Sequence, residues 1–223
     1  MSYKSDFIAF MAEAGVLTFG DFTTKSGRKT PYFINTGNYK TGAQAAKLGE
    51  FYAACIRDRV EGPVDALFGP AYKGIPLAVS TSVALFNQYG QDVKYFFNRK
   101  EAKDHGEGGS FVGYKPKDGD SIVITEDVIT AGTAFRENLP LLKACGDVKI
   151  AALIVSVDRM EKGNGDKTAI DELKEEFSIV TYPIVTVREI IDTLYNKEVN
   201  GKVYIDDAMR QRMEDYLAKY AVK

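Results

Sequence analysis

Two adjacent acids and a turn of small residues stand where an apolar strand is expected to meet a helix. The strand expected over 122–125 delivers Glu126 and Asp127 to its carboxyl end, and Thr130-Ala131-Gly132-Thr133 then opens the next helix. Small residues let backbone N–H groups approach an anion closely, and a helix N-terminus adds a positive dipole. Carboxylates instead accept hydrogen bonds from vicinal hydroxyl groups. The segment therefore suggests a phosphate cradle beside hydroxyl acceptors, which together suit a ribose 5-phosphate.

The alternative is an ordinary strand–helix connection whose acids are simply exposed. The sequence has neither the Gly-x-x-x-x-Gly-Lys-Ser/Thr spacing of a P-loop nor a Gly-x-Gly-x-x-Gly run, so neither of those nucleotide sites is indicated. Thr-Ala-Gly-Thr alone would not decide between the two interpretations. The complete segment 122–134 is far more specific, because it closely resembles the phosphoribosyl pyrophosphate motif of the phosphoribosyltransferases.

A second group of candidate residues lies in a long loop expected over about 98–120. Four basic side chains occur in seven positions: Arg99, Lys100, Lys103 and His105, the last being the chain's single histidine. Three acids balance the three formal positive charges over 99–107, which argues against a nucleic-acid-binding tail. Glycines at 106, 108 and 109 permit a hinged segment. A loop of this length suggests a lid that brings cations onto a polyanion, with a solvated surface loop as the alternative.

The elements around these residues indicate an α/β fold. A helix over about 6–14 and short strands with a hairpin over 17–38 suggest a small N-terminal subdomain, and a helix over about 41–60 follows. Continuous apolar runs then alternate with helices, which favours a mainly parallel sheet flanked by helices. Strands are expected at 64–68, 93–97, 122–125, 150–157 and 179–185, with helices ending near 87 and 144 and others near 168–177, 187–195 and 205–220. Ligands in such sheets sit beyond the carboxyl ends of the strands, so chemistry is expected in the loops after Phe68, Phe97, Thr125 and Val157.

Composition narrows the class of protein. The chain has 223 residues with 45% hydrophobic content, which fits a single globular domain and excludes a disordered chain. A net charge of −2 gives no electrostatic footprint for nucleic acid or membrane. Two cysteines are too few for a disulfide framework, and the N-terminus lacks the features of a secretory signal. We therefore expect a cytoplasmic protein.

Over essentially its whole length the chain resembles the bacterial orotate phosphoribosyltransferase family. The segments that carry the resemblance are 19–28, 69–74, 99–109, 126–134 and Asp158-Arg159. The motif at 126–134 identifies only the wider superfamily, whereas the 99–109 loop is much more specific to this member. The resemblance implies one type I phosphoribosyltransferase domain over 1–223, with about 1–40 forming an N-terminal hood. It also implies transfer of ribose 5-phosphate from phosphoribosyl pyrophosphate to orotate, giving orotidine 5′-phosphate and pyrophosphate within pyrimidine synthesis.

The resemblance also implies roles for individual residues. Asp127 and Lys103 would be the catalytic residues. The ribose hydroxyls and the 5′-phosphate would be held by Glu126, Asp127, Val128, Ile129, Thr130, Ala131, Gly132, Thr133 and Ala134. The pyrophosphate and the ribose would be lined by Lys25, Tyr72 and Lys73, and the pyrophosphate would also meet Arg99, Lys100, Lys103 and His105, partly across a homodimer interface. Orotate would be held by Phe33, Ile34, Thr130 and Arg159. The family often has two aromatic residues where this chain has Phe33-Ile34.

Two further expectations concern ions. Mg²⁺ is the implied cofactor, held mainly by phosphate oxygens and water, so no dedicated protein metal ligands are expected. Orotate carries a carboxylate, and Arg159 at a strand end offers bidentate geometry for it. The alternative for Arg159 is a surface pair with Asp158 or Glu161.

Two other functions compete with this interpretation. One is a phosphoribosyltransferase for another base, such as uracil or a purine, and a purine enzyme would not need Arg159. The other is a noncatalytic regulator that senses phosphoribosyl pyrophosphate and binds nucleic acid. The net charge of −2 and the cationic loop both favour the enzyme over the regulator.

Overall fold

A mostly parallel sheet forms the centre of the molecule. The computed structural model describes residues 2–24, 27–100, 110–129, 132–163 and 165–222. Its largest sheet has six strands in the order β5-β4-β3-β6-β7-β8, and β5 alone runs antiparallel to its neighbour. The strands are β3 (Ala66–Phe68), β4 (Lys94–Asn98), β5 (Phe111–Gly113), β6 (Ser121–Thr125), β7 (Lys149–Asp158) and β8 (Thr181–Thr186). The predicted α/β fold with a mainly parallel sheet is confirmed.

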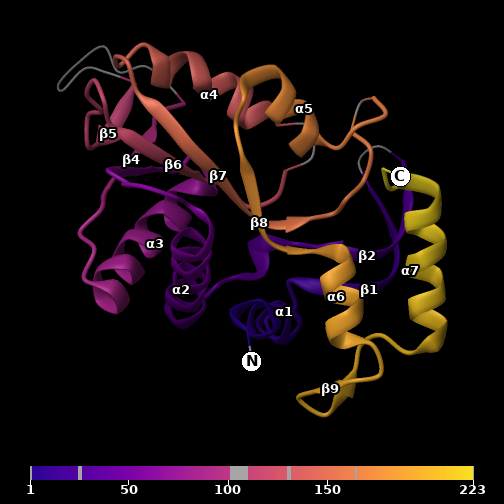
Figure 1. Cartoon of the computed structure of the whole chain (residues 1–223). Helices are drawn as coiled ribbons and strands as arrows, with labels where there is room; N and C mark the ends of the chain where they lie inside the picture. Colours follow the sequence, from indigo (N-terminus) through magenta and orange to yellow (C-terminus); the bar gives the residue numbers. More distant parts are fainter. Residues whose placement is uncertain (1, 25–26, 101–109, 130–131, 164, 223) are drawn as a thin grey trace.

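Helices cover both faces of this sheet (Figure 1). One face packs against α1 (Tyr3–Glu13), α2 (Gly42–Arg59) and α3 (Gly74–Tyr89), and the other against α4 (Thr133–Lys143) and α5 (Ala169–Phe177). Alternate residues of β6 divide between the two cores: Val123 joins the first, and Ile122 and Ile124 join the second. Both faces are therefore apolar, which explains why the strands read as continuous hydrophobic runs.

Residues near the N-terminus form a small antiparallel sheet. It pairs β1 (Leu17–Thr23) with β2 (Lys29–Ile34), and a single turn of 3₁₀ helix, η1 (Thr36–Asn38), follows. The C-terminal helix α7 (Asp207–Tyr220) packs on β2, where the Tyr32 and Tyr216 rings meet edge to face with centroids 5.9 Å apart. The expected small N-terminal subdomain is thus present and is held by the far end of the chain.

Capping boxes fix where several helices begin. The hydroxyl of Thr41 accepts from the backbone N–H of Gln44, whose side chain accepts from the Thr41 N–H at the start of α2. Thr168 before α5 and Thr186 before α6 (Val187–Leu194) make the same reciprocal pair. Each satisfies backbone donors that a helix start would leave unpaired.

The structure departs from the predicted elements mainly at short strands. β5 lies inside the segment that was predicted to be a loop, where Phe111 packs edge-on against Phe68 and Phe96. β9 (Glu198–Val199) and β10 (Lys202–Val203) form a two-residue ladder that was also not predicted. Such short strands have too little periodicity to be recognised in a sequence. Within the described ranges, no helix is both long and apolar enough to cross a bilayer.

Candidate active site

The acid pair follows β6 at the carboxyl edge of the sheet, as predicted. The Glu126 N–H donates to the carbonyl of Ile154 at 2.9 Å, and the Ser156 N–H donates to the carbonyl of Asp127 at 2.9 Å. The buried hydroxyl of Tyr52 donates to the Glu126 carbonyl at 2.7 Å. These bonds tie the first two residues of the loop to β7 and α2. The backbone that carries both carboxyl groups is therefore fixed.

The carboxylate of Asp127 is paired with a cation from another loop. Lys73 Nζ lies 2.8 Å from Asp127 Oδ2, and Thr36 Oγ1 donates to the same oxygen at 2.7 Å. Lys73 Nζ also donates to Thr36 Oγ1 at 3.1 Å. Burial alone would raise the pKa of Asp127, but the hydrogen bonds from Lys73 and Thr36 outweigh it and lower the pKa. Asp127 is therefore charged in the folded chain.

Sequence reasoning missed Thr36. Its hydroxyl joins the acid and the lysine, yet it comes from η1, a turn beside the small N-terminal sheet. The contact with Asp127 spans 91 residues of sequence. Only its place two residues after the predicted base-binding pair Phe33-Ile34 could have drawn attention to it.

Glu126 behaves differently from its neighbour. Burial, and then repulsion from the Asp127 charge, raise the pKa of Glu126 from 4.5 to about 7. Adjacent carboxyl groups whose environments push their pKa values apart are a feature of acid–base and binding sites. Asp127 thus provides a fixed negative charge, and the neighbouring Glu126 becomes charged only near neutral pH.

This difference gives a pH-dependent prediction. The pKa of Glu126 is higher in the folded chain than its ordinary value, so the folded state holds the proton more tightly. The free energy of unfolding should therefore fall as pH rises from 4.5 through about 7, by at most roughly 3 kcal/mol. Glu126→Gln should remove this contribution, which chemical denaturation across that pH range would measure. An unchanged pH slope in the variant would show that Glu126 titrates normally.

The small-residue turn leads directly into a helix. Gly132 has φ of 67°, in the left-handed region that favours glycine, and α4 begins at the next residue. A Cβ atom there would also approach Leu173 Cδ2 to 3.1 Å. A cavity of about 260 Å³ lies against this helix start; it is lined by Pro70, Ile124, Glu126, Asp127, Val128, Ile129, Gly132, Thr133, Ala134, Phe135 and Leu153. The arrangement fits an anion at the helix N-terminus. Thr130 and Ala131 lie outside the described residues.

The loop at 69–74 approaches the same edge of the sheet. A Cβ atom on Gly69 would lie 2.2 Å from the Gly74 carbonyl oxygen, so this tight turn requires glycine. The Ala71 N–H donates to Asn98 Oδ1 at 2.7 Å, which joins the loop to the end of β4. Tyr72 is 69% exposed, and Lys100 Nζ lies 5.7 Å from the centre of its ring.

Three of the predicted cationic residues cannot be placed. Lys25, Lys103 and His105 lie outside the described residues. Arg99 is described: its N–H donates to the Ser110 carbonyl at 2.8 Å, and its buried Nε has no hydrogen-bond partner in the described ranges. The structure therefore places Arg99 and Lys100 at the start of the predicted lid and brings Lys100 to Tyr72.

One larger cavity joins Asp127 of the acid pair to the predicted base-binding residues. Its volume is about 550 Å³. Its walls include Phe33, Ile34, Lys73, Asp127 and Arg159. Phe33 is 37% exposed and its ring stacks on Phe22 with centroids 5.6 Å apart. Residues predicted to contact a base and residues predicted to contact a ribose thus face one space.

Arg159, which lines this cavity, is held by an acid and an aromatic ring. Its Nε lies 2.8 Å and its Nη2 2.6 Å from Glu161 Oε1, and its guanidinium carbon lies 4.5 Å from the centre of the Tyr32 ring. The sequence alternative of a pair with Glu161 is therefore present. It is no open surface pair, because only 16% of the Arg159 side chain and 12% of the Glu161 side chain are exposed.

The chain is similar to known proteins along almost its whole length. Residues 35–184 match the phosphoribosyl transferase domain family. The chain is 56% identical to orotate phosphoribosyltransferase of Clostridium acetobutylicum, over 99% of each chain. It is 54% identical to that of Clostridium beijerinckii, over 100% of this chain and 99% of the relative. A crystal structure of orotate phosphoribosyltransferase from Francisella tularensis superposes with a TM-score of 0.84 at 38% identity, covering 97% of this chain and 99% of the other. With sequence and fold in agreement, the chain belongs to the orotate phosphoribosyltransferase family.

Proposed function

We propose that the protein transfers ribose 5-phosphate from phosphoribosyl pyrophosphate to a ring nitrogen of orotate, releasing pyrophosphate. The observation that carries this proposal is one cavity whose walls include both Arg159 and the Asp127–Lys73 pair. Arg159 offers a carboxylate receptor, and Asp127 offers acceptors for ribose hydroxyls. One pocket therefore offers a receptor for the base and acceptors for its ribose. The whole chain, 1–223, would act as one domain, with about 1–40 as its hood.

The reaction in this family passes through a ribosyl cation-like transition state. Asp127, charged and fixed by Lys73 and Thr36, would hold the ribose hydroxyls and lie beside the developing positive charge. Glu126 would accept the neighbouring hydroxyl in its charged form. The helix start at Thr133 would hold the 5′-phosphate, together with the rest of 126–134. Lys25, Tyr72, Lys73, Arg99, Lys100, Lys103 and His105 would surround the pyrophosphate.

The residues of the site fit a Mg²⁺ ion that is bound mainly by the substrate. Asp127 Oδ2 already accepts from Lys73 and Thr36, and Glu126 holds a proton up to about pH 7, so neither acid is a free, fully charged ligand. We propose that Mg²⁺ binds pyrophosphate oxygens and water, with the two acids reaching it through water. The ion would supply charge neutralisation of the leaving group.

We further propose a cytoplasmic homodimer in which loop 99–109 reaches the partner's site. Support comes from α3, where Val83, Phe86 and Tyr89 expose 53%, 57% and 43% of their surface on one element. An exposed apolar group of this kind is typical of a protein–protein contact. Both cysteines are unpaired, which suits a reducing compartment.

Arg159→Ala should raise the KM for orotate by about 10- to 100-fold, the loss expected when a charge-assisted hydrogen bond is removed. The KM for phosphoribosyl pyrophosphate should change little. Steady-state kinetics with each substrate varied in turn would measure both. Arg188→Ala is the matched control, because Arg188 pairs with Glu214 on an exposed face. Normal orotate binding by Arg159→Ala would place the carboxylate contact elsewhere.

A panel of bases tests the proposed acceptor. Orotate, uracil, adenine and hypoxanthine would be offered separately with phosphoribosyl pyrophosphate and Mg²⁺, and nucleotide products separated by chromatography. We expect a product from orotate alone. A product from uracil or a purine, with none from orotate, would assign the site to another base.

A further inference from the structure

We propose that Glu161 is a positioning residue that orients Arg159 for the carboxylate of the base. This inference rests on the proposed function, because it assigns Arg159 to orotate. It adds a residue outside the substrate contacts, one that acts through Arg159. From the sequence alone, Glu161 is considered only as a surface ion-pair partner of Arg159, an alternative in which Arg159 binds no ligand.

The way the two side chains meet leaves Arg159 free to bind a ligand. Glu161 Oε1 lies 2.8 Å from Nε and 2.6 Å from Nη2, so it occupies the side edge of the guanidinium. The end edge, formed by the two terminal nitrogens, is the edge that pairs with a carboxylate in a forked geometry. Nη2 is buried, and its 2.6 Å contact with Oε1 is not aligned as a hydrogen bond, so within the described ranges its N–H groups lack an aligned acceptor. A buried donor without an acceptor costs free energy unless a ligand supplies one.

Glu161 is itself held from several sides. The hydroxyl of Tyr32 donates to Oε1 at 3.2 Å, and Arg28 Nη1 lies 3.4 Å from Oε2. Arg28 Nη1 also donates to the carbonyl of Lys162 at 3.2 Å. Tyr32 is fully buried and its ring lies against the Arg159 guanidinium. The carboxylate therefore has a fixed place from which it can fix Arg159.

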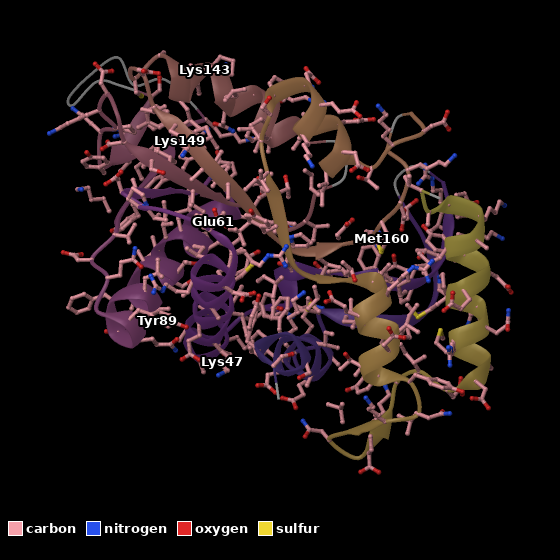
Figure 2. All side chains as sticks on the ribbon, viewed as in Figure 1. Lys47, Glu61, Tyr89, Lys143, Lys149 and Met160 are labelled. Carbon is pink, nitrogen blue, oxygen red and sulfur yellow. The ribbon has the colours of Figure 1, made fainter. Side chains whose placement is uncertain are left out.

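The backbone of this segment is anchored by the end of α7. The Lys162 N–H donates to the Tyr220 carbonyl at 2.9 Å, and the Val222 N–H donates to the Met160 carbonyl at 3.2 Å. Glu161 and Ala221 thus face each other in an antiparallel bridge. Figure 2 labels Met160 on the side of the molecule where α7 lies. The chain's C-terminal residues and β2 together determine where Glu161 stands.

The loss of Glu161 should act on orotate alone. Without Glu161, the Arg159 side chain would lose conformational freedom only when orotate binds, and that cost would weaken binding. Glu161→Ala should therefore raise the KM for orotate by roughly tenfold. The KM for phosphoribosyl pyrophosphate and kcat should stay within about twofold. Glu161→Gln keeps an acceptor for Arg159 and should recover most of the loss. Glu214→Gln is the matched control, since Glu214 also pairs with an arginine, Arg188, away from the cavity.

A double-mutant cycle separates positioning from a general structural effect. If Glu161 acts through Arg159, Glu161→Ala should have little further effect on orotate KM in an Arg159→Ala background. Additive losses, an equal rise in both KM values, or tighter orotate binding by Glu161→Ala would each overturn the proposal. Wild-type turnover distinguishes the failures: no turnover of orotate refutes the proposed function, whereas normal wild-type turnover with an unaffected Glu161→Ala refutes only the role of Glu161.

Discussion

Asparagine in place of Asp127 should lower kcat by about 10²–10³, the loss typical of removing one preorganised electrostatic group from an active site. The change keeps the size of the side chain but removes the charge that faces Lys73 at 2.8 Å and Thr36 at 2.7 Å. Lys73 would then be an uncompensated cation at the proposed ribose position, and one proposed hydroxyl acceptor would be lost. Steady-state kinetics at saturating concentrations of both substrates would measure the effect.

Asp192→Asn is the control for this experiment, because Asp192 is an exposed acid on α6. It should leave kcat unchanged. A near-normal kcat for Asp127→Asn would mean that the Asp127 charge contributes little beyond binding, and would remove this residue from the catalytic group.

Lys103→Ala should also lower turnover by about 10²–10³. Lys103 belongs to the loop that the family resemblance assigns to the pyrophosphate, and its position lies outside the described residues. A cation there would form charge-assisted hydrogen bonds with the leaving group as its charge develops. Closure of the loop would also exclude water from the reacting carbon.

Single-turnover kinetics with excess enzyme would measure this effect free of product release. Lys117→Ala, a change at an exposed lysine that follows the same loop, should behave as wild type. If Lys103→Ala turns over at a near-normal rate, Lys103 has no part in the mechanism.

The central fold could be predicted because its signals are local. β6 has an apolar centre, 122–124, and is followed at once by the acid pair and the small-residue turn, so strand, loop and helix were recognisable together. Burial on both faces produced this pattern in each long strand. β5 was missed because it has three residues and depends on packing of Phe111 against Phe68 and Phe96, which are distant in sequence.

The distinction between local signals and contacts of distant segments also applies to the candidate site. Glu126, Asp127 and Arg159 could be identified from their places at strand ends, and the structure brings Asp127 and Arg159 to one cavity. Thr36, Tyr52 and Glu161 could not, because their hydrogen bonds join segments far apart in the chain or depend on a partner's orientation. Residue type and spacing thus predict the groups that line the candidate site better than the groups that hold them in place.

The ultraviolet absorbance of orotate is the most direct test of the central claim. Purified protein would be mixed with orotate, phosphoribosyl pyrophosphate and Mg²⁺, and the absorbance followed with time. We predict a Mg²⁺-dependent fall that orotidine 5′-phosphate plus pyrophosphate reverses. No change in absorbance by a folded protein that still binds phosphoribosyl pyrophosphate would contradict the assignment of orotate as the acceptor.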